Sequence, residues 1–367
     1  MIKVGKNKKI TFDLLLFSTV IVLSFFGIIM IFSASSPSAF TLHGDSFYFV
    51  KKQIIWTILG FGALFFCSAF DYRNYKKLAP LIYIVNVVLL LLVLIAGVET
   101  KGAKRWLNLG FSTFQPSEFT KIAIVITLSV YFTVMKNTKL TFKNVYIPIG
   151  VLVGIPCALL ILQPHFSVII IIGMTVLGML IAYGLNFKFY VPIFVIGIPA
   201  AIGLVIFSPY RLQRITAFLD PFKDKLGDGW QIVQSLYAIG SGGLVGLGLS
   251  RSRQKHLYIP EPQNDFIFSI ICEELGLIGA LVVIILFCVL IWRCIKISTD
   301  CQDPFGTYLS FGLGLLIIVQ VILNIGVATS SIPPTGVPLP FFSAGGSSFL
   351  FQMISMGIIL NVSRHRS

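Results

Sequence analysis

The chain has 367 residues, of which 56% are hydrophobic and only 11% charged, and its formal net charge is +14. Because soluble domains carry roughly 25% charged residues, this composition excludes an ordinary soluble protein. Apolar segments of about 20 residues, the length of a helix that crosses a bilayer, recur from one end of the chain to the other. We therefore predict an all-α polytopic membrane protein.

Ten membrane-spanning helices are predicted in a single membrane domain that covers residues 1–367. They lie at approximately 12–34, 51–69, 79–97, 117–136, 145–162, 166–184, 189–207, 266–292, 305–328 and 342–362. An even number puts both termini on one side, and the ends and every second loop are rich in Lys and Arg. Since basic loops stay in the cytoplasm, we predict cytoplasmic termini and alternate loops outside the cell.

The start of the chain imitates a signal peptide, with a basic head before an apolar stretch. That stretch is long for a signal peptide and more predicted spans follow it, so we expect a retained first helix. The six cysteines and four histidines show no spacing typical of disulfides or metal ligands. We expect no zinc site, no haem site and no organic cofactor.

The loop before the fourth predicted helix is basic, although the topology places it outside. It reads "TKGAKRWLNLGFSTFQPSEFTK" at 100–121 and includes Arg105. Lys121 falls inside the predicted span, where an ammonium group must be paired or face a wet cavity. Glu118, three residues earlier, is its expected partner.

The longest connection, residues 208–265, is predicted to be an extracellular loop between the seventh and eighth spans. Its "PYRLQRITAFLDPF" motif places Arg211 and Arg214 three residues apart, and Lys255 lies in a second basic run. "GWQIVQSLYAIG" brings Trp230, Val233 and Tyr237 to one helical face, which predicts a short helix in the membrane interface. The glycines at 240–248 do not fit a dinucleotide-binding spacing.

Three carboxylates mark the beginning of the eighth predicted helix. In "YIPEPQNDFIFSIICEELG", Asp265 follows two prolines, and Glu273 and Glu274 lie deeper in the apolar run. Asp265 could simply cap the helix, a role common for Asp. Glu273 and Glu274 could pair with basic groups inside the bundle, since intramembrane carboxylates are either paired or functional.

Three separate basic loops near one carboxylate fit a pocket for a diphosphate with a base beside it. The alternatives are solvated charges at the rim of the membrane and attraction to anionic lipid headgroups.

These residues resemble the SEDS family of cell-wall growth proteins, which includes FtsW, RodA and SpoVE. The resemblance runs through nearly the whole chain in order and is closest to the FtsW and SpoVE branch. It rests on "GAKRWLNLGFSTFQPSEFTK", "PYRLQRITAFLDPF", "GWQIVQSLYAIGSGGLVGLGL", "SRQKHLYIPEPQNDFIFSIICEELGLIG" and "LPFFSAGGSSF".

The resemblance implies a ten-helix peptidoglycan glycosyltransferase of the bacterial cytoplasmic membrane, acting in cell division, cell shape or sporulation. It implies polymerisation of lipid II into β-1,4 glycan strands at the outer face of that membrane. The implied partners are lipid II, the nascent glycan, a class B penicillin-binding protein and membrane lipids; no nucleic acid is expected. By the same likeness, Asp265 matches the acidic residue taken as catalytic, and Arg105, Glu118 and Lys121 match family motifs.

Two motifs depart from the family pattern. The family usually has "QPDLG" where this chain has "QPHFS", so His165 replaces an Asp, and "SYGGSS" where it has "SAGGSS", so Ala344 replaces a Tyr. Replacing Asp by His removes an anion and adds a side chain that can become a cation near pH 6.5.

The mechanism expected from these residues has Asp265 as general base, with cations that stabilise the departing diphosphate. The candidates for substrate contacts are Arg105, Glu118, Lys121, Arg211, Arg214, Lys255 and Glu273. A divalent cation, Mg²⁺ or Mn²⁺, could be shared by Asp265 and the phosphates. Two other functions stay open: a lipid II flippase, and a non-catalytic scaffold for the penicillin-binding protein.

Overall fold

The computed structural model describes residues 12–365 except 101–102, 109, 111–112, 137, 139–140, 224–226, 228 and 257. The helices before the long connection are α1 (Leu14–His43), α2 (Tyr48–Ala69), α3 (Arg73–Ala96), α4 (Pro116–Met135), α5 (Phe142–Ile149), the π-helix η1 (Gly150–Gly154), α6 (Ile155–Leu162), α7 (Phe166–Tyr183), the 3₁₀ helix η2 (Phe187–Phe189) and α8 (Val191–Ile206). They are followed by α9 (Pro209–Leu219), α10 (Trp230–Gly242), α11 (Ile267–Asp300), α12 (Pro304–Ala328) and α13 (Gly346–Ser363). Among the described residues, ten helical segments are long and apolar enough to cross a membrane, which confirms the predicted number.

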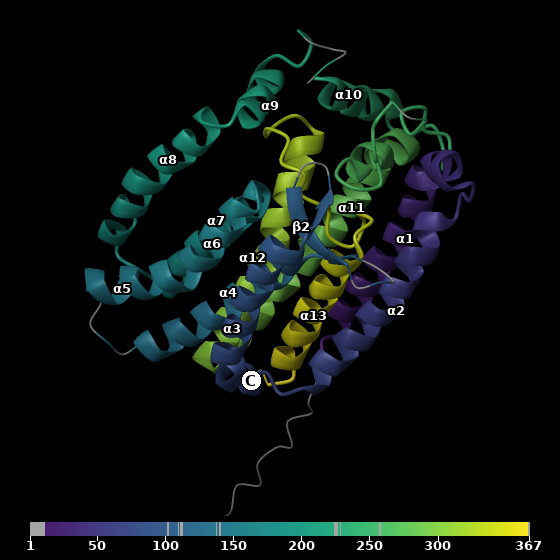
Figure 1. Ribbon diagram of the computed structural model, residues 1–367. Coiled ribbons are helices and arrows are strands. Elements are labelled where there is room, and N and C mark those ends of the chain that lie inside the picture. The colour runs from purple at the N-terminus through teal and green to yellow at the C-terminus, as the bar shows by residue number, and fades with distance from the viewer. Residues whose placement is uncertain are drawn as a thin grey trace, which may run out of the picture.

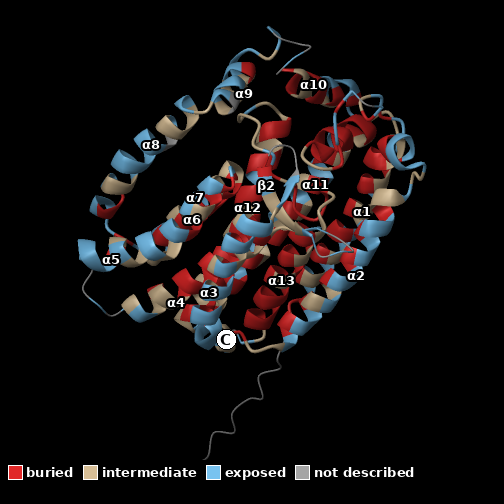
Figure 2. Ribbon diagram, in the orientation of Figure 1, coloured by how far each residue is buried: buried red, intermediate tan, exposed pale blue. Residues whose placement is uncertain are grey.

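The helices form one bundle with a buried centre and an exposed arc (Figure 1). Helices α1, α2 and α11 lie on one side, α3, α4, α12 and α13 in the middle, and α5 to α9 curve along the other side. Buried residues concentrate in α4, α12 and α13 (Figure 2), whereas α8 has none among its described side chains. An apolar helix without a buried face is suited to lipid on most of its circumference.

Two spans continue well past their predicted ends. Helix α1 continues past the expected end at 34 to His43, and α11 continues past 292 to Asp300. The α1 prediction stopped where small polar residues begin, but Ser and Ala are compatible with a helix. The helix ends only at Gly44, whose φ of 68° forms a left-handed C-cap.

A small antiparallel sheet between α3 and α4 was not predicted. Its strands are β1 (Val98–Thr100), β2 (Ala103–Asn108) and β3 (Thr113–Phe114), in the order β1-β2-β3. Strands this short leave too little alternation in the sequence to be separated from a loop. The sheet matters for the site because β2 carries Arg105.

The long connection contains two helices, α9 and α10, rather than the single interfacial helix predicted. Helix α10 begins at Trp230, but the face predicted to lie in the membrane interface is not exposed as a whole, since Val233 is 1% exposed. Gln234 and Ser235 are buried, and Tyr237 is exposed. Ser235 Oγ lies 2.6 Å from Ser269 Oγ of α11 and donates to the carbonyl of Ala328. Helix α10 therefore packs on protein through hydroxyl groups, a contact that hydropathy does not predict.

Helix α11 is interrupted at Gly276, whose φ of 65° and ψ of −165° are not helical. The glycine-rich stretch after α10 packs against this break and forms hydrogen bonds with the backbone groups that the break leaves without helical partners. The bonds run from Leu247 N to Glu273 O (3.0 Å), Gly248 N to Glu274 O (2.9 Å), Leu277 N to Gly243 O (2.9 Å) and Ile278 N to Leu244 O (3.2 Å). A Cβ on Gly246 would lie 2.2 Å from the Glu274 carbonyl, so this approach requires glycine.

Candidate active site

Asp265 lies at the end of the bundle near α10, on the segment that leads into α11. The helix begins at Ile267 with Phe266 as its N-cap, so Asp265 precedes the cap by one residue. Its side chain is partly exposed. The N-cap position, the simpler role considered from the sequence, therefore belongs to a neighbouring residue.

Residues 334–337, in the connection between α12 and α13, contact elements that are far apart in the sequence. Arg214 of α9 donates through Nη1 to the carbonyl of Pro334 at 3.1 Å. At the next residue, Ser167 in the first turn of α7 donates to the carbonyl of Thr335. The segment thus ties α9 and the start of α7 together.

The second half of the same segment contacts the Asp265 region. Gly336 has a φ of +65°, and a Cβ there would lie 3.3 Å from Oδ2 of Asp265. Asn324 of α12 is buried and donates through Nδ2 to the carbonyls of both Asp265 and Val337, each at 2.8 Å. The backbone that carries Asp265 is therefore held by a side chain from the bundle core.

Arg211, one turn before Arg214 on α9, also reaches neighbouring helices. Its Nη1 donates to the carbonyl of Leu204 at 2.6 Å, and its guanidinium lies 4.8 Å from the ring centroid of Phe166. Both predicted arginines of α9 are thus directed toward the start of α7 and the 334–337 segment.

Two more of the predicted cations, Arg105 and Lys121, lie beside the start of α7. The ammonium of Lys121 lies 2.8 Å from Oε2 of Glu118, with both side chains about 95% buried, so the predicted partnership is confirmed. Arg105 donates through Nε to the carbonyl of Gln163 (3.3 Å) and through Nη2 to that of Pro164 (2.5 Å). We call Arg105, Glu118, Lys121 and His165 the basic cluster.

His165 is the residue of the basic cluster that departs from the family pattern, and it is 8% exposed. Its Nε2 lies 3.4 Å from the amide nitrogen of Gln115, and its Nδ1 has no partner among the described residues. Since an amide nitrogen only donates, the neutral ring carries its proton on Nδ1. Burial, reinforced by the positive charges of Arg105 and Lys121, lowers the pKa of His165 to about 3. The imidazole is therefore neutral at physiological pH and adds no cation to the cluster.

This lowered pKa predicts an acid-sensitive stability. Between pH 6.5 and 3 the unfolded imidazole binds a proton that the folded one does not, so stability falls as the pH falls. From pH 7 to 5 the loss should be about 2 kcal/mol in the free energy of unfolding. We expect a denaturant titration in detergent to show this loss in the wild type, and His165→Asn to lack that increment. Equal pH dependence in both proteins would contradict the position given to the ring.

Ala344, the second departure, contributes through its backbone. Its N–H donates to the carbonyl of Gln263 at 2.8 Å, and the neighbouring Ser343 Oγ donates to the carbonyl of Asn264. These bonds hold the two residues before Asp265 and need no tyrosine side chain.

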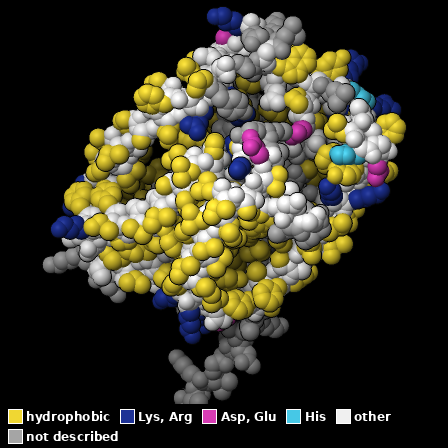
Figure 3. Space-filling view, viewed as in Figure 1, with side chains coloured by type: hydrophobic (Ala, Val, Ile, Leu, Met, Phe, Trp, Pro, Cys, Tyr) yellow, Lys and Arg dark blue, Asp and Glu magenta, His cyan; other side chains and the backbone are white. Residues whose placement is uncertain are grey.

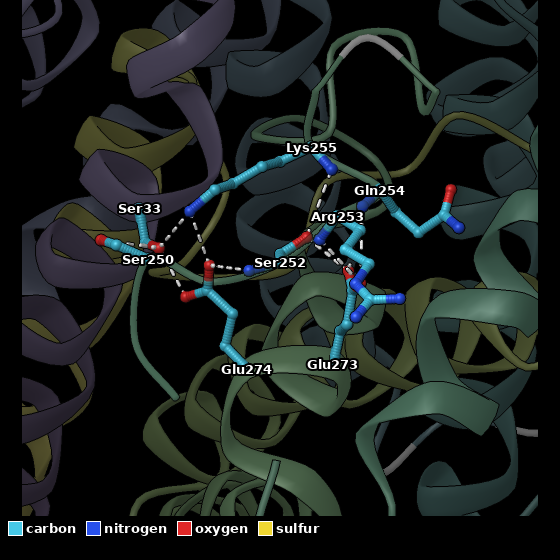
Figure 4. Close-up of polar contacts among 8 residues, drawn as sticks. All are labelled: Ser33, Ser250, Ser252, Arg253, Gln254, Lys255, Glu273 and Glu274. Atoms are coloured by element: carbon cyan, nitrogen blue, oxygen red, sulfur yellow. Dashed lines mark hydrogen bonds and ion pairs between the residues drawn. The ribbon is translucent and has the colours of Figure 1, made fainter. Parts of the chain in front are cut away.

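Glu273, Glu274 and Lys255 form a separate buried network with the 250–255 loop (Figure 4). The Lys255 ammonium lies 2.8 Å from Oε1 of Glu274, and the two side chains are 2% and 0% exposed. Glu274 also accepts from Ser33 Oγ and Ser252 N, whereas Glu273 accepts from Ser252 Oγ and the backbone of residues 253 and 254. This geometry gives Lys255 and Glu273 internal partners, and their predicted substrate contacts stay predictions.

Charged side chains of both signs gather between α9 and the sheet on the face shown in Figure 3, above a wide hydrophobic surface. A charged region of this kind at one end of an apolar bundle suits a substrate with an ionic head and an apolar tail.

Sequence reasoning missed two positioning elements, Asn324 and the 334–337 segment. Asn324 is an amide in an otherwise apolar predicted span, which is itself a signal of function or pairing. Gly336 lies between prolines in "SSIPPTGVPLP", a pattern that indicates a constrained turn without saying what it contacts.

The sequence suggested that Asp265 shares a divalent cation with the substrate phosphates, so the possible metal ligands near it are of interest. Within the described residues, no three His, Cys, Asp or Glu side chains are grouped as metal ligands. Mg²⁺ is commonly held by one or two carboxylates together with substrate phosphates and water. The divalent cation that Asp265 and the substrate phosphates would share therefore stays a prediction.

Comparisons with known proteins agree in covering nearly the whole chain. A family model described as "Cell cycle protein", that of FtsW, RodA and SpoVE, matches residues 13–367. The stage V sporulation protein E of Bacillus subtilis is 40% identical over 98% of this chain and 99% of its own. A probable peptidoglycan glycosyltransferase FtsW of Trichlorobacter lovleyi is 38% identical over 96% of this chain and 93% of its own.

Solved structures share the fold. One chain, from work titled "Structural coordination of polymerization and crosslinking by a peptidoglycan synthase complex", has a TM-score of 0.81 at 27% identity. It covers 97% of this chain and 98% of its own. The rod shape determining protein RodA of Thermus thermophilus has a TM-score of 0.73 at 24% identity, with the same coverage, and supports the fold alone.

Proposed function

Because the chain belongs to the FtsW, RodA and SpoVE family, we propose that it is a multi-pass membrane peptidoglycan glycosyltransferase that polymerises lipid II. The substrate, the outer-face orientation and the partner, a class B penicillin-binding protein, are parts of this proposal. The partner is supported by the likeness to a chain of a peptidoglycan synthase complex. The observation that carries the mechanism is the convergence of Arg214, Ser167 and Asp265 on residues 334–337.

Asp265 acts as general base in this mechanism. Its carboxylate accepts the proton of the acceptor sugar hydroxyl as that oxygen attacks the anomeric carbon of the donor. A new C–O bond forms there while the bond from the anomeric carbon to the diphosphate oxygen breaks, and the diphosphate leaves with the electron pair. Attack from the face opposite the leaving group converts an α-linked donor into a β-linked product.

The cations of the site stabilise the leaving diphosphate. The candidates are Arg211 and Arg214 on α9 and Arg105 on β2, because these two elements bring their guanidinium groups to the region around the start of α7 and residues 334–337. Lys121 shares its charge with Glu118, so it contributes less net positive charge to a phosphate. A divalent cation held by Asp265 and the phosphates would supply further charge stabilisation.

Polymerisation can be tested with the purified full chain and labelled lipid II. We expect a ladder of glycan products on a gel when the chain is incubated with Mg²⁺ or Mn²⁺ and its penicillin-binding partner. No ladder with the partner bound would instead support a scaffold. Movement of lipid II across vesicles without a ladder would support a flippase.

A further inference from the structure

A cavity lies beside the catalytic segment, on the side of the bundle that α1 and α2 form. Its volume is about 340 Å³, and it is lined by Ser38 and Leu42 of α1, Phe49 of α2 and side chains from residues 259–264. Helices α1 and α2 form one side of the bundle, whereas α7 and α9 lie toward the other (Figure 1). The chain that lines the cavity leads directly to Asp265.

The charge of this cavity differs from that of the cation-rich region around α9. Its described lining includes no Lys or Arg, and Glu261 is its one ionisable side chain. A diphosphate needs cations or a metal ion, so the cavity is unsuited to the phosphate end of a lipid-linked substrate. It suits a ligand that is neutral and carries hydroxyl and amide groups.

The lining also has a polar group without a protein partner. Gln263 is 2% exposed, and its Oε1 has no hydrogen-bond partner among the described residues. A buried acceptor without a hydrogen bond costs free energy. Rotation of the terminal amide of Gln263 would bring Oε1 to a donor on a bound ligand, and the new bond would recover that cost. Phe49 and Leu42 supply apolar surface, and the apolar face of a pyranose ring packs well on an aromatic ring.

We propose that this cavity is a glycan subsite, which binds an N-acetylhexosamine ring of the nascent strand away from the diphosphate. The inference rests on the proposed polymerase function. Its size lies in the range of small-ligand pockets, and a neutral amide-bearing sugar matches the Gln263 amide and the apolar walls. A hydrocarbon tail would leave the Gln263 amide unpaired.

The subsite also accounts for how the product of one transfer stays in place for the next. Asn264 lines the cavity and immediately precedes Asp265 in the chain, whereas the Asp265 side chain is not part of the lining. The backbone of residues 263 and 264 is fixed by Ala344 N and Ser343 Oγ, which keeps the cavity wall and Asp265 in one rigid segment.

The test measures binding of N-acetylchitotetraose, a neutral tetrasaccharide without lipid or phosphate, to the full chain in nanodiscs. We expect saturable binding to the wild type and, with the same Kd, to Asp265→Asn. Ser38→Phe, which fills the cavity, should raise the Kd at least tenfold. Thr41→Phe is the matched control, because Thr41 lies one turn away on the exposed face of α1 and should keep the wild-type Kd.

A second variant controls for the possibility that Ser38→Phe weakens binding only because it misfolds. Gln263→Met keeps the length of the side chain but removes the amide, and it should raise the Kd while thermal stability stays at the wild-type value. No saturable binding to the wild type, or equal Kd values for the wild type, Ser38→Phe and Gln263→Met, would overturn the subsite. Competition by a polyprenyl alcohol but not by free sugar would assign the cavity to a lipid tail and also overturn it.

The binding assay separates this inference from the proposed function. If the wild type binds the tetrasaccharide, Ser38→Phe weakens that binding and no polymer forms, the subsite is supported and the polymerase assignment is refuted. If the chain polymerises lipid II but Ser38→Phe binds the tetrasaccharide with the wild-type Kd, the polymerase assignment is supported and the subsite is refuted.

Discussion

Asp265→Asn is expected to abolish polymerisation of lipid II while the protein stays folded in the membrane. A positioned general base contributes roughly 10²–10⁴-fold to a rate, and an amide cannot accept the proton of the attacking hydroxyl at neutral pH. The substitution preserves shape, and the bond from Asn324 goes to the backbone carbonyl of Asp265, which it leaves in place. The measurement is the glycan ladder formed by wild type and variant, together with their thermal stability.

The matched control removes a carboxylate elsewhere on the same end of the bundle. Asp45 follows α1 and pairs with Lys51 at 2.7 Å on the surface, so Asp45→Asn should polymerise at the wild-type rate. Normal ladders from Asp265→Asn would refute its role as base. Loss of activity in both variants would point to a general need for negative charge at this surface instead.

A second test of the same geometry concerns Gly336, which faces the Asp265 carboxylate. Gly336→Ala places a methyl group 3.3 Å from Oδ2 at a backbone φ of +65°, which disfavours any residue with a Cβ. We expect reduced turnover with little change in lipid II binding, because the change displaces the base rather than the cations. A loss of binding with unchanged turnover would show that the 334–337 segment serves the substrate's diphosphate.

The sequence was sufficient for the membrane spans because each span is a local property, a run of apolar residues of fixed length. It was also sufficient for the Glu118–Lys121 pair, since residues three apart on a helix are neighbours whatever the fold. The pattern of charges in an apolar chain directed attention to Asp265 and to three basic stretches, and the resemblance assigned Asp265 the catalytic role. It did not say which cations lie near it, because that depends on contacts between segments far apart in the chain.

Three features could not be predicted for that reason. The 334–337 segment unites α7, α9 and the Asp265 region through backbone carbonyls, which have no side-chain signature. The glycines at 240–248 looked unexplained in the sequence, and only the break at Gly276 shows that they complete the hydrogen bonds of α11. Lys255 was predicted to contact the substrate, and nothing local in the sequence indicates that its loop folds inward onto Glu274.

Removing the ammonium group of Lys255 is expected to lower the free energy of unfolding by roughly 3–5 kcal/mol. Lys255→Met leaves Glu274, which is 0% exposed, without its countercharge, and an unpaired buried charge is strongly destabilising. The measurement is an unfolding titration in detergent. Lys51→Met removes a pair of nearly equal length, 2.7 Å against 2.8 Å, but at the surface, and it should leave stability unchanged.

The paired variant Lys255→Met/Glu274→Met distinguishes a structural lysine from a substrate ligand. Replacing both members of a buried ion pair by apolar residues is often neutral, so most of the lost stability should return. If Lys255 only anchors the 250–255 loop to α11, polymerisation should return with it. If Lys255 instead contacts the diphosphate, the paired variant will be stable and still inactive. A Lys255→Met protein as stable as the wild type would show that the buried pair does not form, and would restore Lys255 to the substrate site.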